Sequence, residues 1–402
     1  MSSSNGGLTF LGLPLDIRLA IYDIVLADHQ AIHQSRQPSN AHIRIIHTCR
    51  QIHCEAGAIF RKYLSLRNEI EIERYHRYAS SFPERTSAVR WADVANDGRI
   101  LETLHTGQIG PASRLYLVLL RLSSLEKLRV FNVRNHHPYA ISVPHSRYHL
   151  DFEGAMFPGL AAQKSLPQLQ SYELYLDPST RASPFQLLLS DRVRSLRLSG
   201  DCHLTTKARF PALCHLTMRG ITSNAFDQVR FNVTFAESRL DSFIHAQGHR
   251  LGFEIRNVHL ESLIVGPGSH LRKLVLLGCT RLTTSVIASC LRDLPTLEYF
   301  ALSLVTVNEL RENFILALGP SLRTLKLQIT HAWYAIPLLS KERVICNSLE
   351  ERMVAPQSLQ TLYVAFHARL MTEDMREERW KRIANARHLT LKLGPWEDDE
   401  ET

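Results

Sequence analysis

Residues 271–303 of the 402-residue chain read LRKLVLLGCTRLTTSVIASCLRDLPTLEYFALS, and this stretch decides the fold. Leu274 and Leu276 are two residues apart, so in a strand both side chains point to the same face; Leu271 lies three residues before Leu274. Apolar residues at helical spacing follow Gly278, and the same apolar triplet then returns. The stretch therefore predicts a strand, a turn, a helix and a second strand.

The apolar triplet recurs from the middle of the chain to its end. It occurs at Leu125-Leu128-Val130, Leu169-Tyr172-Leu174, Val193-Leu196-Leu198, Leu213-Leu216-Met218, Leu260-Leu263-Val265, Leu271-Leu274-Leu276, Leu297-Phe300-Leu302, Leu322-Leu325-Leu327, Leu359-Leu362-Val364 and Ala386-Leu389-Leu391, with a weaker copy at Leu240-Phe243-His245. Most middle residues are 20, 24, 25, 26 or 27 residues from the next, and one strand with one helix or 3₁₀ turn needs about 20–29 residues. The spacing predicts an α/β solenoid over residues 122–396, in which helices accompany a curved parallel sheet.

The spacing departs from this rule in three places. The 44 residues from Leu128 to Tyr172 fit two turns with a degenerate unit between them, and the 37 residues from Leu325 to Leu362 indicate an insertion. Only 11 residues separate Leu263 from Leu274, whereas a parallel crossover needs about a dozen or more. Either these two strands form a hairpin joined directly by residues 266–269, or one of them lies outside the solenoid. We expect the hairpin.

Residues 271–303 resemble the cysteine-containing class of leucine-rich repeat, which is common in F-box proteins. Cys279 and Cys290 are expected to pack in the core, because a free cysteine behaves as a small buried hydrophobe. The rest of the C-terminal part resembles the same repeat more loosely.

Residues 8–64 have a different, helical character. Pro14 suits a helix start, and Ile17, Ile21, Ile24 and Val25 then follow at helical spacing. The spacing predicts helices over 14–26 and 43–63, with the polar stretch between 28 and 40 as a loop.

This segment resembles the divergent F-box of filamentous fungi. The resemblance rests on Leu13-Pro14-Leu15-Asp16-Ile17, where the family usually has Glu at the fourth position, and on Thr48-Cys49-Arg50-Gln51-Ile52-His53-Cys54-Glu55-Ala56. It implies that residues 8–64 dock on a Skp-family adaptor of a cullin ligase core. The residues it assigns to this contact are Leu13, Pro14, Asp16, Ile17 and Ile21. Periodicity alone leaves a second interpretation open, in which the helices only cap the solenoid.

Residues 65–121 are expected to be a connector or a first partial repeat. The alternation in residues 69–73 predicts a strand with one wet face, and residues 115–122 are expected to form a helix. Trp91 is a candidate anchor for the junction. Residues 397–402 form an acidic run that we expect to be a disordered tail.

In this repeat, the residues beside and between the last two core positions face the concave side of the solenoid. Seven of the thirty such positions in the ten strong triplets are Lys or Arg, and only Glu173 is acidic. The expected target-binding residues are Lys127, Arg129, Arg197, His215, Arg219, Lys273, Lys326 and Lys392. A basic face of this kind favours an acidic or phosphorylated segment of a partner protein.

No sequence feature indicates catalysis. Nucleophile elbows, phosphate-binding glycine loops and zinc-protease motifs are all missing from the sequence, so we expect a non-enzyme without metal or cofactor. The two Cys-His pairs, Cys202-His203 and Cys214-His215, are weak candidates for metal ligands because His215 alternates with a core leucine. The seven cysteines are scattered, and the chain begins without the pattern of a signal peptide. These features predict a cytoplasmic or nuclear protein that does not bind membranes.

The best interpretation is a substrate-recruiting, F-box-like subunit of a cullin-type ubiquitin ligase, whose solenoid binds the target protein. Two alternatives remain. The chain is a non-catalytic repeat scaffold with a helical cap, or the basic concave face binds nucleic acid or phospholipid. The net charge of +8 and the pI of about 9.2 are only a mild argument for nucleic acid.

Overall fold

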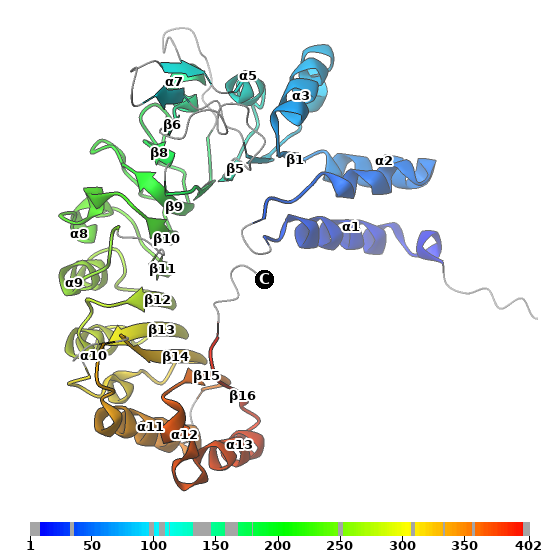
Figure 1. The fold of residues 1–402 in the computed structure, drawn as a ribbon. Coiled ribbons are helices and arrows are strands. Elements are labelled where there is room, and N and C mark those ends of the chain that lie inside the picture. Colours follow the sequence, from blue (N-terminus) through cyan, green and yellow to red (C-terminus); the bar gives the residue numbers. More distant parts are fainter. Residues whose placement is uncertain are drawn as a thin grey trace, which may run out of the picture. The chain divides into compact units, whose positions relative to one another are not determined.

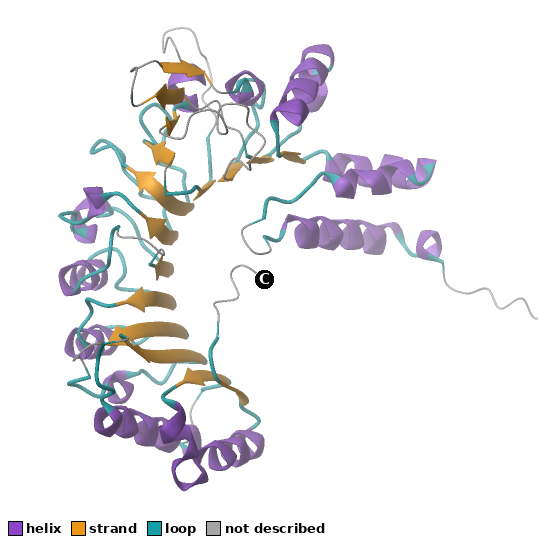
Figure 2. Ribbon diagram, viewed as in Figure 1, coloured by secondary structure: helices purple, strands orange, loops and turns teal. Residues whose placement is uncertain are grey.

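A computed structural model describes residues 9–32, 36–95, 100–103, 109–111, 113–131, 146–156, 168–178, 180–247, 252–306, 310–332, 334–355 and 358–396. The described residues form two compact units, the first up to residue 169 and the second from residue 170 to residue 396. Figures 1 and 2 show both units as ribbons. The predicted α/β class, with parallel strands and accompanying helices, is confirmed in both.

The first unit opens with helices. They are η1 (Phe10–Gly12), α1 (Leu15–Gln30), η2 (Ala41–His47) and α2 (Arg50–Phe60). α1 extends to Gln30, into the stretch predicted as loop. The second predicted helix is divided in two, because Cys49 is extended and caps α2 by accepting a hydrogen bond from the Ile52 amide at 3.5 Å.

The core between these helices is formed by Tyr22, Leu26, Ile46, Ala56, Phe60 and Tyr63. The buried stripe of α1 is Arg18, Tyr22, Leu26 and Gln30, spaced four residues apart. Of the apolar positions predicted to mark one face of the helix, Ile17 and Ile24 are exposed, and Ile21 and Val25 are half-buried. Arg18, on the buried stripe, forms an ion pair with Glu55.

The rest of the first unit mixes parallel and antiparallel strands. It contains β1 (Tyr63–Leu66), α3 (Glu69–Ser81), α4 (Pro83–Thr86), β2 (Trp91–Val94), β3 (Ile100–Thr103), β4 (Ile109–Pro111), α5 (Leu115–Leu119), β5 (Lys127–Phe131), β6 (Ser146–Leu150) and α7 (Phe152–Met156). β2 pairs in parallel with β1 and with β5, so the strand pattern already begins before residue 122. β3 pairs antiparallel with β4 and β6, so β6 is not the parallel repeat unit expected between Leu128 and Tyr172.

The strand predicted at residues 69–73 is wrong, since these residues open helix α3. The Asn68 side chain caps this helix by accepting from the Glu71 amide at 3.0 Å. Glu69 and Glu71 lie in the first turn, where the helix dipole favours negative charge. The cap and the dipole account for the helix despite the strand-like alternation.

The second unit is a run of parallel strands, each paired with its neighbours along the chain. The strands on this path are β7 (Ser171–Tyr175), β9 (Ser195–Cys202), β10 (His215–Ile221), β11 (Ser242–Ala246), β12 (Lys273–Cys279), β13 (Tyr299–Thr306), β14 (Thr324–His331), β15 (Thr361–Ala365) and β16 (Thr390–Leu393), and β8 (Thr180–Ala182) pairs with β9. The middle core residues are aligned from strand to strand: Tyr172, Leu196, Leu216, Phe243, Leu274, Phe300, Leu325, Leu362 and Leu391. This consecutive parallel order is the topology of a solenoid.

Helices follow the strands on one side of the second unit (Figure 2). They are η3 (Asn224–Phe226), α8 (Phe231–Thr234), α9 (Asn257–Val265), α10 (Thr284–Arg292), η4 (Phe314–Ala317), α11 (Leu339–Val354), α12 (Ala368–Thr372), η5 (Glu373–Met375) and α13 (Arg376–Arg387). α11 accounts for the insertion expected between Leu325 and Leu362.

The hairpin expected between Leu263 and Leu274 is wrong. Leu263 lies in helix α9, and the repeat that precedes β12 is β11, the weak triplet at Leu240-Phe243-His245. The last triplet is also misplaced. Leu389 precedes β16, and Leu391 is the residue that pairs with Leu362.

The predicted repeat core is otherwise confirmed. The side chains of Leu128, Leu196, Leu216, Leu274, Phe300, Leu325, Leu362 and Leu389 are all buried, as are Cys279 and Cys290. Gly200, Gly220 and Gly278 each follow the third core position by two residues and have positive φ, which permits the strand to bend there. Within the described ranges, no helix is long and apolar enough to cross a membrane.

Candidate functional site

An apolar strip runs along the outer side of α1. We define the α1 strip as Leu13, Ile17, Ile21 and Ile24, which are spaced three or four residues apart. Ile17 is 46% exposed and Ile24 is 67% exposed, while Leu13 and Ile21 are half-buried. Pro14, Leu15 and Asp16 beside the strip are exposed. The adaptor-docking residues predicted from the sequence are therefore all accessible to some degree, with Leu13 and Pro14 just before α1 and Asp16, Ile17 and Ile21 within it.

An ion pair on the opposite side of α1 holds this face in place. The Arg18 guanidinium donates to both carboxylate oxygens of Glu55, at 2.9 and 2.6 Å, and the Tyr22 hydroxyl donates to the same carboxylate at 3.2 Å. Hydrogen bonds from Arg18 and then Gln51 lower the pKa of Glu55 to about 2. Arg18 also donates to the carbonyl oxygens of Leu11 and Leu13. The segment that leads into α1 is thereby fixed to the helix.

The second candidate surface follows the strands of the second unit. We define the strand face as the residues between the last two core positions: Glu173, Arg197, Thr217, Ile244, Val275, Ala301, Lys326, Tyr363 and Lys392. These residues alternate with the core leucines, as the repeat pattern predicts. The face has polar and charged residues at both ends and an apolar centre of three consecutive strands.

Trp396 covers this apolar centre. Its side chain is 7% exposed and forms a cluster with Ile244, Val275 and Ala301. Leu277, Tyr299 and Tyr363 pack against the same cluster. The segment after β16 therefore occupies part of the surface that the sequence assigns to a partner.

The cations of the strand face lie over aromatic rings. Lys326 is 3% exposed, with its Nζ 5.1 Å from the Tyr363 ring centroid and 5.8 Å from that of Trp396. Arg197 is also buried and stacks on Tyr175 at 4.2 Å. Such cation–π contacts hold these positive charges against aromatic rings of the same chain. Of the expected basic residues in this unit, Lys392 and His215 are exposed, and Arg219 and Lys273 are half-buried.

The two remaining basic candidates belong to the first unit. Lys127 is exposed, with its Nζ 4.5 Å from the Trp91 ring centroid. Arg129 is buried and donates to both oxygens of Asp93, at 2.7 and 2.6 Å, and to the Gln30 carbonyl at 2.9 Å. Arg129 is therefore a structural partner of Asp93 rather than a surface residue.

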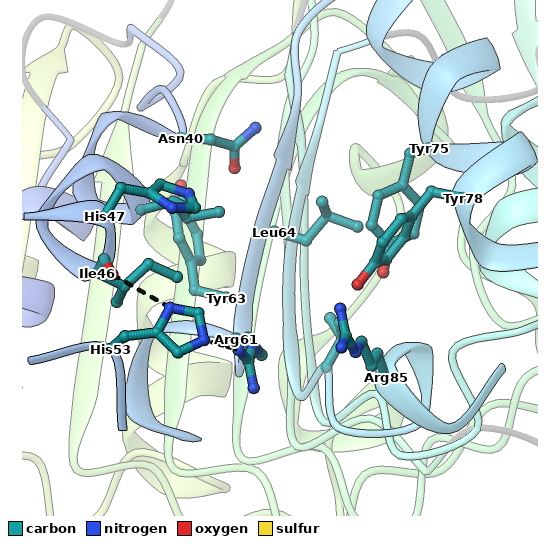
Figure 3. A pocket seen from close by; sticks show the side chains of 12 residues that line it. Asn40, Ile46, His47, His53, Arg61, Tyr63, Leu64, Tyr75, Tyr78 and Arg85 are labelled. Atoms are coloured by element: carbon teal, nitrogen blue, oxygen red, sulfur yellow. Dashed lines mark hydrogen bonds between the residues drawn. The ribbon is translucent and has the colours of Figure 1, made fainter. Parts of the chain in front are cut away.

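The first unit also contains a pocket that the sequence does not indicate. It lies between η2, α2, β1, α3 and α4, with a volume of about 420 Å³ (Figure 3). Its lining comes from positions between 40 and 89 that no single motif connects. Within it, Tyr75 and Tyr78 are three residues apart on α3 and so lie on one side of that helix.

Metal chemistry has no candidate among the residues that the structure describes, where no three His, Cys, Asp or Glu side chains are grouped as ligands. Cys202 donates to the Ser199 carbonyl at 2.8 Å, and burial raises the pKa of its thiol to about 12. His203 instead pairs with Asp201 at 2.8 Å. Cys202 and His203 thus form separate local hydrogen bonds, and in the second pair Cys214 donates to the Ala212 carbonyl at 3.4 Å while His215 is exposed.

Comparisons with known proteins add no family to this description. No protein-family model matches the chain, and a search of curated proteins finds no significant match.

Proposed function

We propose that the chain is a non-catalytic adaptor: its N-terminal helices dock on a Skp-family subunit of a cullin-type ubiquitin ligase, and its leucine-rich-repeat-like solenoid holds a target protein. The observation that carries the proposal is the exposed α1 strip. Such a strip is needed for docking, whereas a cap would bury it.

The sequence resemblance and the geometry support the same docking residues. The F-box pattern assigns Leu13, Pro14, Asp16, Ile17 and Ile21 to the contact, and none of them is buried. Arg18 and Glu55 stabilise the helix from behind, so the strip is already ordered before a partner binds. Preorganisation of this kind reduces the entropic cost of association.

The target would contact the strand face through aromatic residues more than through the basic residues. Tyr299 and Tyr363 are aromatic anchors beside Trp396, and Lys392 lies at the rim. Aromatic side chains contribute strongly to protein interfaces, while exposed rim charges contribute little. We therefore infer a protein target that is recognised through aromatic contacts.

The docking half of the proposal is tested with the purified full-length chain and a purified Skp-family adaptor. Isothermal titration calorimetry should detect a complex, and Ile17→Asp should weaken it at least about tenfold, because a charge would be placed in an apolar contact. Val265→Asp is the matched control, since Val265 is 80% exposed at the end of α9 in the other unit. Absence of a complex with the unmodified chain, or equal losses from both variants, would refute docking through α1.

A further inference from the structure

The pocket of the first unit combines apolar walls with a cationic rim. Ile43, Ile46, Leu64 and Val89 contribute aliphatic surface, and Tyr63, Tyr75 and Tyr78 contribute aromatic rings. Asn40, His47, His53, Arg61 and Arg85 complete the lining. A volume of about 420 Å³ lies within the range of small-molecule sites, about 300–1,000 Å³, and such sites are mostly apolar with a few polar groups.

The charges around this pocket are of one sign. Its lining includes two arginines and two histidines but no Asp or Glu. Some other arginines of the first unit have carboxylate partners, as Arg67 has in Glu71 and Arg77 in Glu73. The pocket lining, in contrast, contributes guanidinium groups and no carboxylate.

Neither arginine of the pocket is neutralised by a carboxylate within the described residues. Arg61 contacts the His53 ring nitrogen at 3.3 Å, and the Arg85 guanidinium lies 5.2 Å from the Phe82 ring centroid. His53 is itself oriented by a contact of 3.2 Å between Nδ1 and the Ile46 carbonyl, which is the dashed line in Figure 3. Both guanidinium groups thus keep donors for an anion, and arginine can bind a carboxylate through two parallel hydrogen bonds.

Tyr75 and Tyr78 add neutral donors at the same site. Their rings are 5.7 Å apart, and Figure 3 shows their hydroxyl ends directed toward Arg85. Within the described chain, neither hydroxyl has a hydrogen-bond partner. Burial, followed by the proximity of Tyr78, raises the pKa of Tyr75, so its hydroxyl stays protonated and can donate.

We propose that this pocket binds a small aromatic carboxylate. The aromatic body would lie against the Tyr75 and Tyr78 rings, Leu64 and Val89, and the carboxylate would be held by Arg61 or Arg85 with the hydroxyl of Tyr75 or Tyr78. Aromatic stacking accounts for the shape of the ligand, and the unopposed guanidinium groups account for its charge. The site is separate from the α1 strip, so this proposal does not depend on the adaptor function.

The test uses three probes with one aromatic body: naphthalene-2-carboxylate, the neutral naphthalene-2-carboxamide and the cationic 2-(aminomethyl)naphthalene. Binding to the full-length chain is measured by ligand-observed NMR. The carboxylate should bind about tenfold more tightly than the amide, because charge-assisted hydrogen bonds are about twice as strong as neutral ones. The cation should bind more weakly than both.

Variants locate the binding. Arg61→Gln combined with Arg85→Gln should reduce carboxylate affinity to that of the amide and leave amide binding within about twofold. Arg74→Gln is the control, because Arg74 is exposed on α3 and lies outside the pocket lining. Equal binding of all three probes, or a carboxylate affinity that the double variant leaves unchanged, would overturn the proposal.

Discussion

His245 should make the second unit sensitive to acid. It occupies the third core position of β11, between Met218 of β10 and Leu276 of β12. The side chain is 2% exposed, and among the residues that the structure describes neither ring nitrogen has a hydrogen-bond partner. Burial, followed by the nearby His259, lowers the pKa of His245 to about 3. The ring therefore stays neutral in the folded chain while it is protonated in the unfolded chain below about pH 6.5.

The size and sign of the effect follow from this difference. The unfolded state takes up a proton that the folded state refuses, so the free energy of unfolding falls as pH decreases from about 6.5 towards about 3. At pH 4.5 the loss is about 2–3 kcal/mol, because the pH is about two units below the ordinary pKa and each unit corresponds to about 1.4 kcal/mol. His245→Leu should abolish this loss. At neutral pH the same variant should gain about 1–3 kcal/mol, since two unsatisfied buried polar atoms disappear.

The measurement is urea denaturation of both chains at pH 7.5 and pH 4.5, followed by circular dichroism and tryptophan fluorescence. The advantage of His245→Leu should grow by about 2–3 kcal/mol at the lower pH. Other shifted histidines, such as His42 with a pKa lowered to about 4, are present in both chains and cancel in the comparison. The two signals must change at the same urea concentration, because a free energy of unfolding is defined only for a two-state transition. An advantage that is equal at both pH values would refute the reasoning.

Three further changes test the packing. Leu274→Ala should lower the free energy of unfolding by about 2–5 kcal/mol in urea denaturation, because the side chain is fully buried and a cavity would remain. Arg129→Met should cost about 3–5 kcal/mol by leaving the buried Asp93 carboxylate without its positive partner, and adding Asp93→Leu should recover part of that loss; no recovery would contradict the ion-pair account. Trp396→Ala should expose the apolar centre of the strand face and cost about 2–3 kcal/mol, with increased binding of an apolar fluorescent dye as a second readout; unchanged dye binding would show that Trp396 does not cover this centre.

The repeat core could be predicted because the physical constraint is local and periodic. When two leucines are two residues apart in a strand, both point to the same side, and that side must face the core. Each stacked strand repeats this arrangement. The pattern fails where the same spacing of apolar residues also fits a helix. Leu260 and Leu263 are three apart, which also places both on one face of a helix, and that is how α9 uses them.

At the weak triplet Leu240-Phe243-His245, the pattern fails because a true core position is polar. A histidine normally argues against a core strand, so the pattern ranks this triplet below Leu260-Leu263-Val265. The fold nevertheless buries the imidazole, with its ring 5.6 Å from that of Phe253. Tertiary packing outweighs the local preference here, and no pattern within five residues could reveal it.

The candidate sites divide in the same way. The α1 strip lies in one short segment, α1 and the residues just before it, so its members could be chosen from spacing and from resemblance. Its partial exposure is what the resemblance implies, but the ion pair of Arg18 with Glu55, 37 residues away, could not be predicted from spacing. The pocket depends on five elements that meet only in the folded chain, and sequence spacing does not encode such a meeting.

On the strand face, the direction in which a side chain points does not determine whether that side chain is exposed to a partner. The repeat register correctly places Arg197, Lys326 and Lys392 on the face opposite the core. Yet an alternating pattern cannot distinguish a solvated cation from one that is covered by rings, as Lys326 is by Tyr299, Tyr363 and Trp396. Screening by salt acts mainly on exposed charges. A partner that binds this face through its aromatic centre should therefore depend less on ionic strength than the count of basic residues alone would indicate.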